Sequence, residues 1–186
     1  MKKYIYTVML VLLSITIAQA QRMLPKQKGL EVNAGVLSNN KIGNDYYINV
    51  AMTVNGKNGN YQLWALEYSQ QDYEYKDSHI PQETYTAEGG YSFFLLSDPR
   101  KNITFNAAII GVVGYESINR GEELLFDGAK IASEDNFIYG AGGRLSFETY
   151  LSDRFVLVLQ GRTKVLWGRD LRLFRPSAGI GFRINF

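Results

Sequence analysis

Apolar and polar residues alternate along most of the chain with a period of two, the pattern of a β-strand whose two faces meet different surroundings. The C-terminal segment shows this most clearly, because apolar side chains occupy every second position: Pro176, Ala178, Ile180, Phe182, Ile184 and Phe186. The positions between them hold Ser177, Gly179, Gly181, Arg183 and Asn185. The segment therefore predicts a strand with one apolar face and one polar or small face.

The same alternation recurs upstream and predicts eight strands in all. We expect them at Leu30–Leu37, Tyr46–Val54, Tyr61–Ser69, Tyr85–Leu96, Ile103–Tyr115, Phe137–Glu148, Phe155–Trp167 and Pro176–Phe186. Several of these strands are long enough to cross a lipid bilayer at a tilt. Antiparallel outer-membrane barrels also have an even number of strands.

The connections between these strands alternate in length. Short turns are expected at Asn55–Asn60, Ser97–Asn102 and Leu151–Arg154, and long loops at Ser38–Asp45, Gln70–Thr84, Glu116–Asn136 and Gly168–Arg175. This asymmetry is typical of outer-membrane barrels, whose turns face the periplasm and whose loops lie outside the cell. Because an open sheet edge in hydrocarbon would leave backbone groups unpaired, the strands must close on themselves. The pattern predicts an all-β fold, an eight-stranded antiparallel transmembrane up-and-down β-barrel.

Aromatic residues near the strand ends fit two girdles at the membrane interfaces. On the loop side we expect Tyr46, Tyr68, Tyr85, Tyr115 and Trp167. On the turn side we expect Tyr61, Tyr150, Phe155 and Phe186.

The face with smaller and more polar side chains is the expected interior, which eight strands make just wide enough for side chains to fill. The charged residues assigned to it are Glu31, Glu67, Glu88, Arg144, Glu148, Arg162, Lys164 and Arg183. Because a buried charge without a partner is strongly disfavoured, they predict a structural ion-pair network in the lumen. A proton or ligand path is the functional alternative. A soluble lipocalin-like barrel would alternate in the opposite sense, with its apolar residues inward.

The first twenty residues are typical of a signal peptide that is removed on export. Two lysines precede an apolar stretch, and Ala18 and Ala20 form a small-x-small cleavage site. We expect cleavage before Gln21, so that residues 21–186 form the barrel domain in the outer membrane.

The amino-acid composition limits which binding and catalytic sites the chain can form. Removing Lys2 and Lys3 from the 20 basic residues leaves 18, which equals the number of acidic residues, so no direct contact with nucleic acid is expected. The absence of cysteine excludes disulfides, thiolate metal sites and a lipidated N-terminal cysteine. The single histidine, His79, lies near Asp72, Asp77 and Ser78 in an expected loop. These residues could contribute to a hydrolytic site like those of lipid A modifying barrels. A catalytic triad, however, is defined by the spatial roles of its residues and not by their proximity in sequence. We expect no catalytic residues, no cofactor and no metal.

Long stretches of the chain resemble the conjugal transfer protein TraO family of conjugative transposons in Bacteroides and relatives. The resemblance is carried by QRMLPKQKGLEVNAG, NGKNGNYQLWALEY, IPQETYTAEGGYSFFLL and VVGYESINRGE. It continues through EDNFIYGAGGRLSFETYLSDRFVLVLQGRTKVLWG and the ending RPSAGIGFRINF.

This resemblance implies a component of the apparatus that passes a mobile element from donor to recipient, without enzyme activity. The expected partners are outer-membrane lipid, other transfer proteins and, during biogenesis, the barrel-assembly machinery, for which Phe186 resembles a terminal aromatic signal. Two other functions stay open: a general outer-membrane barrel for adhesion or envelope integrity, and a barrel enzyme that modifies lipid.

Overall fold

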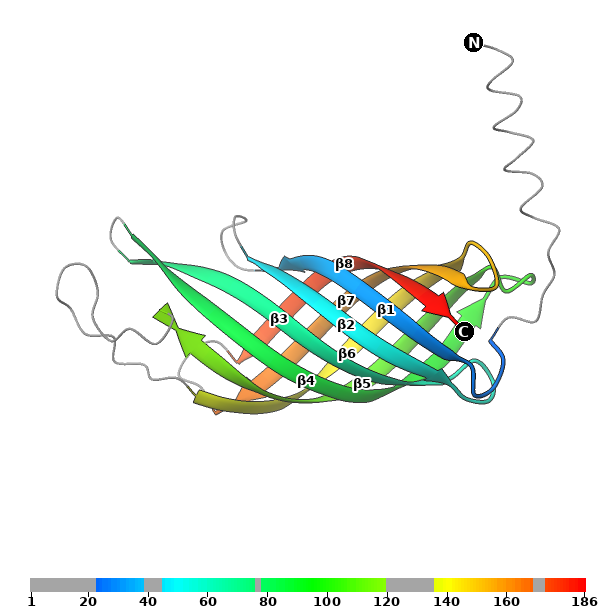
Figure 1. Cartoon of the computed structure of the whole chain (residues 1–186), viewed down its shortest axis with the longest axis horizontal. Helices are drawn as coiled ribbons and strands as arrows, with labels where there is room; N and C mark the ends of the chain where they lie inside the picture. Colours follow the sequence, from blue (N-terminus) through cyan, green and yellow to red (C-terminus); the bar gives the residue numbers. More distant parts are fainter. Residues whose placement is uncertain (1–22, 39–44, 76–77, 120–135, 169–172) are drawn as a thin grey trace, which may run out of the picture.

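The alternating segments form eight strands that close into a barrel (Figure 1). The computed structural model describes residues 23–38, 45–75, 78–119, 136–168 and 173–186. The strands are β1 (Lys28–Leu37), β2 (Tyr46–Asn55), β3 (Tyr61–Tyr75), β4 (Ser78–Ser97), β5 (Ile103–Ile118), β6 (Asn136–Tyr150), β7 (Phe155–Trp167) and β8 (Phe174–Asn185). In these residues, no helix is long and apolar enough to cross a membrane.

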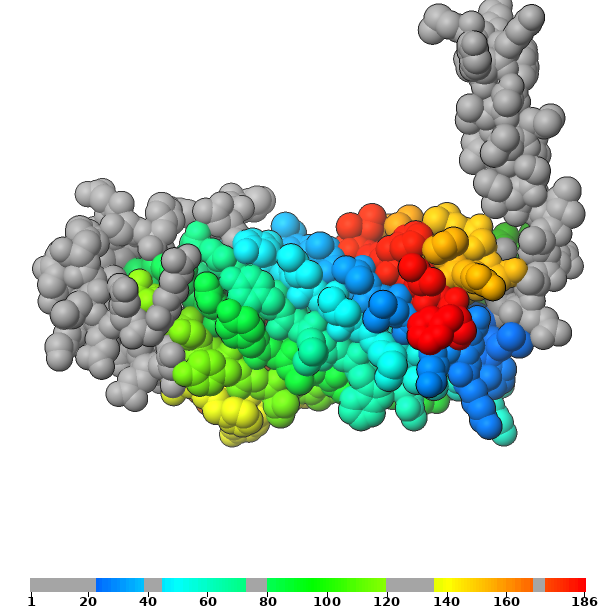
Figure 2. Space-filling view, in the orientation of Figure 1, coloured from blue at the N-terminus to red at the C-terminus, as the bar shows by residue number. Residues whose placement is uncertain are grey.

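Each strand pairs antiparallel with its neighbours in sequence, and β1 pairs with β8 to complete the ring. The closing register runs from Gly29 opposite Asn185 to Leu37 opposite Ser177. Figure 2 shows β8, in red, packed directly against β1, in blue. The predicted eight-stranded antiparallel barrel is therefore confirmed.

The strands at the loop end are longer than the sequence pattern predicted. The loop expected at Gln70–Thr84 is wrong, because β3 and β4 stay paired from Gln70 opposite Glu83 to Tyr75 opposite Ser78. Glu116 and Arg175, both expected in loops, belong to β5 and β8. These extensions carry few large apolar side chains, so the alternation of apolar and polar residues that marks the other strands fades there.

The two faces of the wall have opposite character. Large apolar side chains cover the outside, including Leu66 at 69% exposure, Ile109 at 67% and Phe137 at 65%. Charged and amide side chains are buried inside, beside an apolar cluster formed by Ala51, Tyr61, Leu63, Ala65, Ile110, Val112, Ile138 and Leu166. This arrangement is opposite to that of a soluble lipocalin-like barrel, in which apolar residues face inward and polar residues face outward.

The loop-end aromatic residues expected in a girdle do lie on the outer face. Tyr68 makes ring contacts with Tyr46 and Tyr85, with centroids 6.2 Å and 5.2 Å apart. The hydroxyls of Tyr46 and Tyr68 donate hydrogen bonds to Gln70 at 3.1 Å and 3.3 Å. Polar groups therefore begin directly above these rings.

The turn-end girdle was predicted wrongly at two positions. Tyr61 and Tyr150 are only 2% and 6% exposed and point into the lumen. They occupy the alternate positions of their strands whose side chains face inward. Phe155 and Phe186 are outward as expected, at 42% and 69% exposure. Phe155 stacks on the ring of Phe182, with centroids 5.6 Å apart.

The segment before β1 covers the turn end of the barrel. Met23 packs against a lumen cluster formed by Tyr150, Val156 and Val158. The backbone N–H of Lys26 donates to the carbonyl of Asn55 at 2.7 Å. The expected signal peptide, with Ala18, Ala20 and Gln21, lies outside the described residues.

Closure of the barrel depends on glycines at the seam between β1 and β8. Gly35 lies opposite Gly179, and a Cβ on Gly35 would overlap the carbonyl oxygen of Ala178 and lie 2.6 Å from the Cα of Gly179. We expect Gly35→Ala to lower the free energy of unfolding by about 1–3 kcal/mol, the usual range for overpacking. Urea unfolding of the barrel in detergent, followed by heat-dependent gel mobility, measures this.

The matched control is Gly161→Ala, because a Cβ there meets nothing within 4 Å. Its unfolding midpoint should stay near that of the unsubstituted protein. Equal stability of the two variants would contradict the importance of the seam.

Candidate functional site

The lumen holds a first group of ionic side chains near the turn end, which we call the Arg183 cluster: Glu31, Arg144, Glu148, Arg183 and Tyr61. The Arg183 guanidinium donates from Nη1 and Nη2 to the two Glu148 carboxylate oxygens at 3.0 Å and 3.1 Å. Its Nε donates to Glu31 at 2.7 Å, and Arg144 reaches the other oxygen of Glu31 at 2.8 Å. Four strands thus contribute to one pair of carboxylates.

Tyr61, expected on the membrane face, completes this cluster instead. Its hydroxyl donates to Glu148 at 2.6 Å and accepts from Arg183 at 3.2 Å. The Arg183 guanidinium also lies 4.7 Å from the centre of the Tyr61 ring. Charge-assisted hydrogen bonds and a cation–π contact together offset part of the cost of burying these charges.

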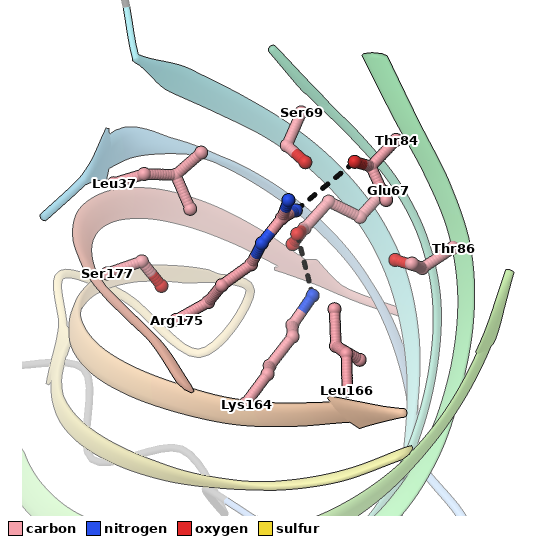
Figure 3. A pocket seen from close by; sticks show the side chains of 9 residues that line it. All are labelled: Leu37, Glu67, Ser69, Thr84, Thr86, Lys164, Leu166, Arg175 and Ser177. Carbon is pink, nitrogen blue, oxygen red and sulfur yellow. Dashed lines mark hydrogen bonds and ion pairs between the residues drawn. The ribbon is translucent and has the colours of Figure 1, made fainter. Parts of the chain in front are cut away.

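A second group, the Lys164 cluster, contains Glu67, Glu88, Arg162 and Lys164. The Lys164 ammonium contacts Glu67 at 2.6 Å and also pairs with Glu88. Arg162 lies 2.6 Å from Glu67 and 3.7 Å from Glu88. Its guanidinium stacks 4.1 Å from the centre of the Tyr47 ring. Figure 3 shows Lys164 and Glu67 reaching toward one another across the lumen.

Two asparagines connect the clusters. Asn33 donates to Glu31 at 2.9 Å and to Asn49 at 3.1 Å. Asn49 in turn donates to Glu67 at 3.4 Å. All eight charged residues that the sequence placed in the lumen are therefore buried and connected, and the connecting amides were not predicted.

A further ion pair, between Glu116 and Arg175, was missed. Arg175 lies 3.2 Å from Glu116. It also donates to the hydroxyl of Thr84 at 3.1 Å, as Figure 3 shows. Both residues have inward parity in β5 and β8, so extending the period-two pattern by one strand position would have found them. They add a fifth acid and a fifth base to the eight described above.

Side chains nearly fill the space between these charges. The cavity bounded by Glu67, Thr84, Lys164 and Arg175 has a volume of about 10 Å³, roughly the room one water needs (Figure 3). The mutually paired charges connect strands of opposite walls across the lumen and leave no open channel in this part of the barrel.

The hydrolytic alternative falls largely outside the described structure. The backbone of His79 belongs to β4, but its side chain and those of Asp77 and Ser78 lie outside the described part. Asp72 donates its backbone N–H to Asp45 at 2.9 Å. Among the described residues, no group of three or more acidic or histidine side chains could hold a metal ion.

The turn end carries a concentration of positive charge that the linear sequence did not reveal. Its exposed cations come from separate segments: Lys26, Lys28, Lys57, Arg100, Lys101 and Arg154. The acidic side chains beside these six are those of Asp98 and Asp153. The backbone N–H of Ile103 donates to Asp98 at 2.8 Å, which holds the pKa of that carboxyl below its usual range and keeps it charged.

The Arg183 cluster gives a direct test of the ion pairs. Arg183→Met leaves Glu31 and Glu148 without their shared partner, so we expect the free energy of unfolding to fall by about 3–5 kcal/mol. Urea unfolding in detergent measures the change. Arg154→Met is the matched control, because Arg154 is exposed in a turn at the same end. A similarly small effect of both substitutions would contradict a stabilising network.

Comparison with known proteins agrees with this geometry. Neisserial surface protein A superposes with a TM-score of 0.56 at 13% identity, covering 87% of this chain and 97% of that chain. The N-terminal β-barrel domain of Pseudomonas aeruginosa OprF gives a TM-score of 0.53 at 11% identity, covering 87% and 98%. At these identities the likeness shows a shared fold.

Sequence comparison is more specific about the family. The comparison with curated proteins gives no significant match. The family model described as conjugative transposon protein TraO matches residues 24–186. This confirms the resemblance drawn from the sequence, and the chain belongs to the TraO family of conjugative transposon proteins.

Proposed function

We propose that this protein is a non-enzymatic outer-membrane barrel of a conjugative transfer apparatus, which it serves by contacting other transfer proteins. The observation that carries the proposal is the pairing of family membership with an inverted barrel, apolar outside and ionic inside. Apolar residues belong on the outside of a barrel only where lipid replaces water.

Three features support the membrane location. The closed ring has no free strand edge, as hydrocarbon requires. The outward apolar band ends at tyrosines whose hydroxyls bond to polar side chains at the loop end. The basic turn end then faces the periplasm, and residues 1–20, cleaved after Ala20, supply the export signal.

The filled lumen supports a scaffold rather than a conduit. The paired charges serve to hold the barrel shut, and the transferred DNA passes elsewhere. Phe186, whose backbone N–H donates to the carbonyl of Lys28 at 2.8 Å, serves the barrel-assembly machinery as a terminal aromatic signal before this seam forms.

The basic turn end supports one surface for partner contact. Lys57, Arg100, Lys101 and Arg154 lie in or beside the three short turns, where they project beyond the strands. An acidic surface on a periplasmic transfer protein complements this charge and is steered toward it.

An in-frame deletion of the gene in the donor tests the function as a whole. We expect a large drop in transfer frequency that a complementing copy restores, while donor growth and detergent sensitivity stay normal. Unchanged transfer in the deletion strain would overturn the proposed role and favour adhesion or envelope integrity.

Charge reversal tests the partner surface. The double variant Lys57→Glu, Lys101→Glu should lower transfer frequency at unchanged barrel abundance in the outer membrane, and Lys57→Gln, Lys101→Gln should lower it less. Glu83→Lys, at the opposite end of the barrel, is the control and should leave transfer unchanged. Equal transfer by all these strains would contradict contact through the turn end.

A further inference from the structure

A groove on the outer wall interrupts the apolar surface over β3 to β7. Its floor consists of the small residues Ala87, Gly89 and Gly111, and its volume is about 490 Å³. Trp64 stands on one side, and Tyr139 and Trp167 on the other. We call this feature the outer groove.

The walls and floor are fixed by strand register. Gly89 lies opposite both Trp64 on β3 and Gly111 on β5. A Cβ on Gly89 would lie 3.0 Å from the Trp64 ring, so the ring occupies the space that a side chain at this position would need. Tyr139 pairs with Trp167, and their rings are 6.2 Å apart. Contacts with neighbouring residues therefore hold the rings of Trp64, Tyr139 and Trp167 in place.

The outer groove continues toward the loop end. A second depression of about 660 Å³ shares Ala87 and Val113 with it and reaches the rings of Tyr68, Tyr85 and Tyr115. Tyrosine hydroxyls at such a rim lie at the level of lipid headgroups. The continuous depression thus runs from the apolar band to the expected interface.

The surroundings favour one kind of occupant. The outward side chains of the outer groove are small, aliphatic or aromatic, and none carries a charge. A hydrocarbon chain lying in it contacts the floor and the rings beside it, so it gains more dispersion contacts than a chain on the rest of the wall. Because the Trp64 ring lies against Gly89, the open floor is narrower than the roughly 10 Å that two strands span. A helix with its side chains is about 10–12 Å across and would have to displace the anchored rings.

We propose that the outer groove binds an acyl chain of a lipid in the loop-side leaflet and retains that lipid against exchange with the bulk bilayer. This inference rests on the membrane location proposed above. It adds a defined lipid site that the barrel fold alone does not require.

The two tryptophans of the chain both stand in the groove walls, so their fluorescence reports its occupancy. The purified barrel in detergent is titrated with phosphatidylethanolamine carrying brominated acyl chains, which quench tryptophan on contact. We expect one saturable quenching step. Gly111→Leu should abolish it, since a side chain there enters open space above the floor, and Gly111→Ala should weaken it.

Gly161→Leu is the matched control, because it adds the same side chain to an outward glycine outside the groove that has nothing within 4 Å. It should keep the saturable step, and native mass spectrometry should find lipid retained by this variant and lost from Gly111→Leu. Heat-dependent gel mobility verifies that each variant is folded.

Linear quenching that is equal in all folded variants would overturn the lipid site and leave the membrane location standing. Lipid-free protein that crosslinks to a second copy through the groove would overturn it in favour of self-association. Recovery of the unsubstituted protein in the soluble periplasm would overturn the membrane location itself, and the lipid site with it.

Discussion

Closure of the sheet is the constraint on which the rest of this structure depends. Pairing β1 with β8 leaves no free strand edge, and with only eight strands it makes the interior narrow. A narrow interior must be filled by side chains from opposite walls that fit one another. The glycines at the seam, where Gly35 faces Gly179, are one consequence, since any larger side chain would meet backbone.

Much of the filling of the lumen is ionic, and the free-energy cost of burying these charges is offset by their pairing. Each of the five buried glutamates has a cationic partner within 3.2 Å or, for Glu88, in the shared contact with Lys164. The clusters are joined by Asn33 and Asn49, so that charge, amide and aromatic groups form one connected interior. Such an interior resists local opening, because releasing one group leaves its partner buried and unpaired.

Because side chains fill the lumen, other molecules contact the barrel through its outer surfaces. The described turn end is basic, the wall is apolar, and a groove floored by glycine interrupts that wall. These surfaces face different media in the proposed orientation, periplasm for the first and lipid for the second. The family assignment gives the biological setting, and the surfaces define where contacts can be sought.

The sequence by itself determined the strand number, the antiparallel order, which face is apolar and the inward position of eight charged residues. The strands and their two faces follow from period-two alternation, which acts within each strand and needs no knowledge of its neighbours. The antiparallel order follows from the alternation of short turns and long loops between the strands. The prediction failed where apolar and polar residues no longer alternate clearly. At the loop end, Glu116 and Arg175 were assigned to loops. Beside the turns, Tyr61 and Tyr150 were assigned to the wrong face.

The tertiary structure decided which charges pair, that asparagines connect them, that scattered cations meet at one end and that Gly89 and Gly111 form a floor. Each of these depends on register and on distance across the barrel, which are properties of several strands together.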